Sequence, residues 1–148
     1  MATPSLNRSG QCLCGSVKLT ATLTKPTIHA CHCTQCQRWT GGGPLLVVEV
    51  DELKVETTAE PTVFRASDHG ERASCSVCGS PLWWRMQGRP VRSVAVGLID
   101  DQSDLEVTEE IFVDFRPCWL EAYNGASQST QAEEYEKLEA FLAKTQSS

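Results

Sequence analysis

Two pairs of closely spaced cysteines decide the fold: Cys12-Leu13-Cys14-Gly15 near the start of the chain and Cys75-Ser76-Val77-Cys78-Gly79 near its middle. Cysteines this close do not easily form a disulfide with each other, because a disulfide prefers particular Cα separations and torsions. The same spacing suits a tetrahedral zinc ion, which binds thiolates at about 2.3 Å. Four thiolates from two distant segments therefore predict one closed, structural zinc site that joins them.

A third group of cysteines lies between the two pairs, in Cys31-His32-Cys33-Thr34-Gln35-Cys36. It leaves three thiolates for a second ion, and three protein ligands with one open position are the arrangement of a catalytic zinc. His29 is an alternative fourth ligand, because a residue two positions before Cys31 points to the same side of an extended segment. His32 is expected to point away from the ion and to have a packing or supporting role. Cys118 stands alone, and we expect a buried free thiol.

The composition of the 148 residues, 41% hydrophobic, is ordinary for one globular domain. The apolar runs are too short for a membrane-spanning helix of about 20 residues. A net charge of -6, with scattered basic residues, argues against nucleic acid as a partner. The first residues lack the apolar stretch of a secretory signal, so we expect the protein in the cytoplasm. In that reducing compartment cysteines favour metal binding; the alternatives are a secreted disulfide framework or cysteines that fill a core.

The apolar pattern along the chain predicts a mainly β fold. Val17, Leu19, Ala21 and Leu23 alternate with polar residues, which is typical of a half-buried strand. The one expected helix covers about residues 130–144, because Thr130 and Glu133 have the spacing of a capping box and apolar residues then recur at helical spacing. Further strands are expected at residues 28–31, 45–50, 53–57, 62–65, 82–85, 91–98 and 111–113.

The three cysteine groups, in this order and spacing, resemble the glutathione-dependent formaldehyde-activating (GFA) family. Leu98-Ile99-Asp100-Asp101, Ile111-Phe112-Val113 and Arg116-Pro117-Cys118-Trp119 are similar to later landmarks of that family, so the resemblance runs from about Gly10 to Trp119. It implies an Mss4-like fold of several short antiparallel sheets around zinc sites. We expect a single domain over residues 1–148, with its core at about 10–120.

The resemblance also implies two Zn²⁺ ions per chain and a carbon–sulfur lyase activity, the reversible joining of formaldehyde to a thiol such as glutathione. It assigns the structural zinc to Cys12, Cys14, Cys75 and Cys78, and the second zinc to Cys31, Cys33 and Cys36. The residues alone support a narrower statement. A small-molecule thiol that enters the open position would lose its proton, and the thiolate could then add to an aldehyde carbon.

A glutathione-like substrate carries carboxylates and needs a cationic partner. Arg38, two residues after Cys36, is the first candidate, against the alternative that it is a solvated surface charge. The main alternative function is a non-catalytic, zinc-stabilised module that binds a protein partner. A thiolate redox or metal-storage protein is less favoured, because zinc would lock these loops. An open ion at Cys31, Cys33 and Cys36 would support the enzyme, and a closed or absent ion the module.

Overall fold

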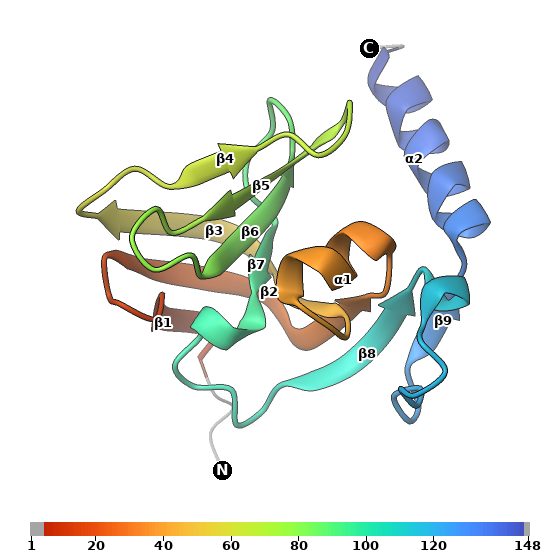
Figure 1. The fold of residues 1–148 in the computed structure, drawn as a ribbon, viewed down its shortest axis with the longest axis horizontal. Coiled ribbons are helices and arrows are strands. Elements are labelled where there is room, and N and C mark those ends of the chain that lie inside the picture. The colour runs from red at the N-terminus through yellow and green to blue at the C-terminus, as the bar shows by residue number, and fades with distance from the viewer. Residues whose placement is uncertain (1–4, 147–148) are drawn as a thin grey trace. The chain divides into compact units, whose positions relative to one another are not determined.

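The computed structural model describes residues 5–146, which form mainly β structure with two α-helices (Figure 1). The helices are α1 (Thr34–Thr40) and α2 (Gln131–Gln146), and two short 3₁₀ turns are η1 (Val96–Leu98) and η2 (Val113–Phe115). No helix within these residues is long and apolar enough to cross a membrane. The strands are β1 (Asn7–Gln11), β2 (Val17–Cys31), β3 (Leu45–Thr57), β4 (Thr62–Phe64), β5 (Gly70–Ser74), β6 (Pro81–Met86), β7 (Ser93–Ala95), β8 (Glu106–Ile111) and β9 (Ser127–Ser129).

The predicted mainly β fold with a C-terminal helix is confirmed. Hydrogen bonding orders the strands as β4-β5-β6-β7-β3-β2-β8-β9, with β1 also paired to β2. One sheet therefore takes the place of the several short sheets that the resemblance implied. The reason is the length of β2 and β3, 15 and 13 residues, which fuse strands expected separately. The pair β8 and β9 is parallel.

The chain divides into two compact units, each described by itself. The first contains residues 5–28 and 46–106 and holds the hydrophobic core. The predicted alternation along β2 is confirmed, because Val17, Leu19, Ala21 and Leu23 are all buried. Each fully buried Val or Leu side chain contributes about 1.5–3 kcal/mol relative to exposure. They pack in one cluster with side chains of β3, β6 and β7, among them Val48, Val50, Leu82 and Val94.

Strand β1 was not expected, because its sequence is polar and has no apolar alternation. It is held by antiparallel pairing with β2 and by a close approach to the turn η1. A Cβ on Gly10 would lie 2.2 Å from the carbonyl oxygen of Leu98, so only glycine fits there. The strand expected to reach residue 98 ends at Ala95, because η1 turns Val96 and Leu98 into the core.

The second unit contains residues 29–45 and 107–146. Helix α1 was not expected; it ends at Thr40, and Gly41 after it has a φ of 91°, the left-handed conformation common after helices. The strand expected at 111–113 does not form: β8 ends at Ile111, and Phe112, with a φ of 56°, turns the chain into η2. At the start of α2 the capping box is confirmed, with the Glu133 amide donating to the Thr130 hydroxyl over 3.3 Å and the Thr130 amide donating to the Glu133 carboxylate over 3.1 Å.

Candidate metal centres

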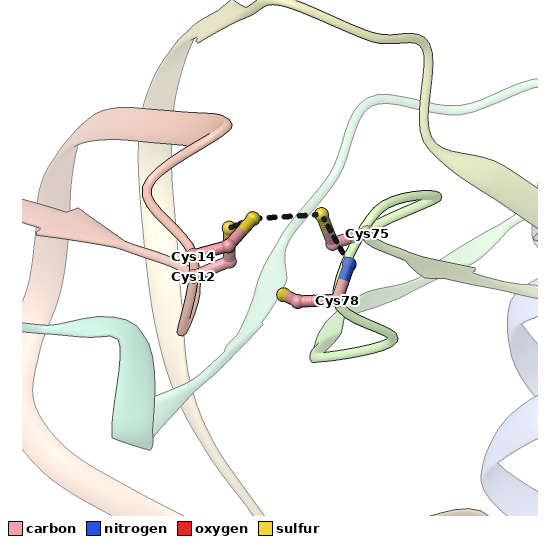
Figure 2. A group of neighbouring side chains, drawn as sticks. All are labelled: Cys12, Cys14, Cys75 and Cys78. Atoms are coloured by element: carbon pink, nitrogen blue, oxygen red, sulfur yellow. Dashed lines mark hydrogen bonds between the residues drawn. The ribbon is translucent and has the colours of Figure 1, made fainter.

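The structure brings together the four cysteines of the two pairs, all within the first unit. Their sulfurs lie within 4.8 Å of one another, and Figure 2 shows the sulfurs of the two pairs pointing toward each other. The Cys12 and Cys14 sulfurs are 3.7 Å apart, and those of Cys14 and Cys75 are 3.8 Å apart. A tetrahedral ion with sulfur ligands at about 2.3 Å separates neighbouring sulfurs by about 3.8 Å. The donor set therefore fits one tetrahedral, thiol-binding metal ion.

Two tight turns place these sulfurs. The Cys12 amide donates to the Val17 carbonyl over 3.0 Å across the turn between β1 and β2, and Gly15 in this turn has a φ of 81°. Between β5 and β6, the Gly79 amide donates to the Cys75 carbonyl over 2.9 Å. Gly79 has a φ of 80°, which explains the glycine after each pair.

Backbone amides and a hydroxyl surround the four sulfurs with hydrogen-bond donors. The Val17 amide donates to the Cys12 sulfur over 3.3 Å, and the Val77 amide donates to the Cys75 sulfur over 3.4 Å. The Ser80 hydroxyl, 3.1 Å from the Cys78 sulfur, lowers the pKa of Cys78 to about 5. Donors of this kind favour thiolates, which are the form that binds a metal.

Cys31, Cys33 and Cys36 form a second group in the second unit, again with sulfurs within 4.8 Å of one another. Cys31 ends β2, Cys33 is the N-cap of α1, and Cys36 lies in its first turn, where its amide donates to the Cys33 sulfur over 3.3 Å. Hydrogen bonding to Cys33 and Cys36 raises the pKa of Cys31. Three sulfurs this close need a cation before all three can carry negative charge. This donor set also fits a metal ion.

The other candidate ligands and contacts lie elsewhere. Nδ1 of His29 is 3.5 Å from a carboxylate oxygen of Glu109, and His29 does not join the three-cysteine group. Cys118 is exposed, so the expectation of a buried thiol was wrong; the turn that the Leu120 amide closes onto the Pro117 carbonyl places it in solvent. Arg38 is exposed on α1, two residues and about 200° around the helix from Cys36.

Sequence reasoning missed a buried ionic network beside the three-cysteine group. His32 was expected only to have a packing or supporting role, and its Nε2 lies 2.8 Å from a carboxylate oxygen of Glu110. Nε of Arg116 lies 3.3 Å from the same oxygen. No pattern in the sequence could reveal these contacts, because His32 and Glu110 are 78 positions apart and Glu110 belongs to the polar strand β8.

Comparison with known proteins agrees with this geometry. The family model of the glutathione-dependent formaldehyde-activating enzyme matches residues 7–114, which include both cysteine groups. The chain belongs to this family. The GFA match ends before Arg116 and before α2.

Two curated relatives of this GFA chain carry related names. An uncharacterized lyase of Schizosaccharomyces pombe is 22% identical over 122 residues, which cover 82% of this chain and 89% of the relative. A Halomonas elongata protein, named for glutathione-dependent formaldehyde activation, is 30% identical over 83 residues, or 50% of this chain and 53% of its own length. The crystal structure of a Rhodobacter sphaeroides protein matches with a TM-score of 0.53 and 20% identity, over 68% of this chain and 99% of that one. The similarity to this crystal structure shows a shared fold and nothing about function.

Proposed function

We propose that this chain is a zinc-dependent carbon–sulfur lyase of the cytoplasm, built as a single domain, that acts on a thiol–aldehyde adduct such as S-hydroxymethylglutathione. The observation that carries the proposal is the three-sulfur group of Cys31, Cys33 and Cys36, which no histidine, aspartate, glutamate or further cysteine joins within residues 5–146. Three protein ligands leave a position for substrate. Membership of the GFA family supports the same reaction class.

The two cysteine groups have different roles in this proposal. Cys12, Cys14, Cys75 and Cys78 would hold a structural zinc, because four thiolates fill a tetrahedral ion. Cys31, Cys33 and Cys36 would hold the second zinc, which supplies a Lewis acid that favours the thiolate form of a substrate sulfur. Arg38 stays the candidate to bind a substrate carboxylate; it lies about 200° around α1 from Cys36, so its long side chain would have to extend around the helix to reach a substrate at the three sulfurs.

The lyase reaction breaks one carbon–sulfur bond. The hydroxyl group of the adduct loses its proton and becomes the carbonyl of formaldehyde, while the bonding electrons leave with the sulfur. The resulting thiolate takes up a proton and departs as the free thiol, so the reaction needs no oxidant or reductant. The chain's own part is to fix three sulfurs at one place: the end of β2 positions Cys31, and the first turn of α1 positions Cys33 and Cys36.

The test is the rate at which glutathione and formaldehyde exchange with their adduct, measured by NMR magnetisation transfer. The wild-type protein with two equivalents of Zn²⁺ should accelerate the exchange, and Cys36→Ser should abolish the acceleration. Cys118→Ser is the matched control, because Cys118 is an exposed cysteine outside both groups, and it should exchange at the wild-type rate. Wild-type protein that binds two zinc ions and leaves the exchange rate unchanged would contradict the lyase and favour the non-catalytic module.

A further inference from the structure

The buried carboxylate of Glu110 contacts His32, the residue between Cys31 and Cys33. Glu110 on β8 and His32 both have fully buried side chains, each 0% exposed. Nε2 of His32 lies 2.8 Å from Oε1 of Glu110. His32 is covalently linked to Cys31 on one side and Cys33 on the other, so whatever fixes His32 also limits the movement of both cysteines.

Both oxygens of Glu110 have partners in the second unit. Nε of Arg116 is 3.3 Å from Oε1, and the Tyr123 amide donates to Oε2 over 2.9 Å. The guanidinium of Arg116 compensates the negative charge of the carboxylate, which would otherwise be costly to bury. Glu110 therefore joins β8, the segment with His32 and the segment with Tyr123 through a carboxylate with little freedom to move.

The backbone of His32 is fixed on both sides as well. Its amide donates to the Ile111 carbonyl over 3.0 Å, and its carbonyl accepts from Nε2 of Gln37 over 2.7 Å. The same Gln37 nitrogen donates to the Phe115 carbonyl over 2.9 Å. A cysteine sulfur is only one rotatable bond from the backbone, so the backbone at Cys31 and Cys33 largely sets where the two sulfurs lie.

We propose that Glu110 is a positioning residue for the three-cysteine group: through His32 it holds Cys31 and Cys33 where both can bind one metal ion. This inference rests on the proposed metal-binding role of those cysteines. Residues that orient metal ligands without touching the metal commonly change metal affinity about 10–100-fold when they are removed. Removal of Glu110 should not affect the four-cysteine group, because the sulfurs of that group are fixed by turns of the first unit.

The test measures zinc release from the full chain to a chromogenic chelator. Cys36→Ser identifies the kinetic phase that belongs to the three-cysteine group, because that phase should disappear. In Glu110→Gln, which keeps the side-chain volume, and in Glu110→Ala, this phase should become about 10–100-fold faster. Release from the four-cysteine group should stay at the wild-type rate. Glu109→Gln is the matched control: Glu109 lies on the same strand and is only half-buried, so both phases should be unchanged.

Two further measurements separate positioning from a general loss of structure. The absorption bands of Co²⁺ bound at the three-cysteine group should shift in Glu110→Gln, while the bands from the four-cysteine group should not. Since Glu110 acts through His32, adding Glu110→Ala to His32→Ala should accelerate release by less than twofold further. If Glu110→Ala does not fold, Glu110→Gln decides the matter.

Three outcomes would overturn the proposal. One is a wild-type release rate from the three-cysteine group in a folded Glu110→Gln. Another is equal acceleration of both phases together with a lower melting temperature, which would give Glu110 a purely structural role. The third concerns the proposed function itself: if wild-type protein and Cys36→Ser hold the same single equivalent of zinc, the three-cysteine group binds no metal, and both proposals are wrong.

Discussion

Arg8 and Asp104 form a bidentate ion pair in the first unit. The two terminal nitrogens of Arg8 donate to the two carboxylate oxygens of Asp104 over 2.9 and 2.8 Å. The Arg8 side chain is 4% exposed and that of Asp104 is 21% exposed. Arg8 lies on β1, and this strand leads directly to Cys12, so the pair also anchors the segment that carries the first two clustered cysteines.

Replacement of Asp104 should lower the stability of the protein by an amount that depends on pH. The hydrogen bond from Arg8 holds the pKa of Asp104 below its ordinary value. A carboxyl group whose pKa is lower in the folded state stabilises the protein above its unfolded pKa of about 3.9 and loses that contribution as pH falls through the folded pKa. Asp104→Asn should therefore lower the melting temperature most at neutral pH, and the difference from wild type should shrink as the pH falls below about 4.

Thermal melting of both proteins between acidic and neutral pH measures this effect. Any metal held by the cysteines would leave both proteins alike as the thiolates are protonated, so the difference between the two melting curves isolates the ion pair. Asp100→Asn is the control, because it removes the same charge from an exposed position on the same loop. A difference in melting temperature that stays constant down to pH 3 would contradict the prediction.

The sequence predicts those parts of the fold whose signals are local. Cysteine spacing indicated both groups of sulfurs, and the alternation from Val17 to Leu23 indicated the buried face of β2. Helix α1 has only seven residues, about two turns, which are too few to show a repeating apolar pattern, and its N-cap is a cysteine. Strand β5 was missed because it contains the buried charged residues Glu71 and Arg72, which a search for apolar alternation passes over. The Glu110 network depends on contacts between segments far apart in the chain, which no local pattern records.

A methyl group at Gly10 should destabilise the first unit. The Cβ of Gly10→Ala would lie 2.2 Å from the carbonyl oxygen of Leu98, and this backbone atom cannot move without shifting β1 or η1. Overpacking of this kind costs about 1–3 kcal/mol of unfolding free energy. Gly97→Ala is the control, because its Cβ would meet nothing within 4 Å, and chemical denaturation of the two variants gives the comparison. Equal midpoints for the two variants would show that β1 adjusts freely.

Chelation should remove two zinc ions from the protein at different rates. We expect two equivalents under reducing conditions, one for each cysteine group. A mild chelator should take the ion from Cys31, Cys33 and Cys36 first, because three protein ligands leave a position that a competing ligand can enter. Metal analysis before and after such treatment should fall from two equivalents to one, while the melting temperature changes little. A protein that never holds more than one equivalent would contradict this expectation.

The two cysteine groups should differ in what they contribute to stability. Cys75→Ser removes one of the four ligands of the proposed structural ion, which would join turns 61 positions apart, counted from Cys14 to Cys75. Since structural zinc binding is coupled to folding, this change should lower the free energy of unfolding by about 3 kcal/mol or more. Cys36→Ser should cost much less, because Cys31, Cys33 and Cys36 lie within six residues and close little chain.

Calorimetric titration with glutathione distinguishes the two groups by a second property. Wild-type protein and Cys75→Ser that remains folded should bind the thiol, whereas Cys36→Ser should not, because it lacks a ligand of the open ion. Cys118→Ser again serves as the control for loss of a thiol outside both groups and should melt and bind like the wild type. If Cys36→Ser melts as low as Cys75→Ser, the second ion is structural. In that case the three-cysteine group stabilises the second unit, and the reaction proposed for it has no open position at which to occur.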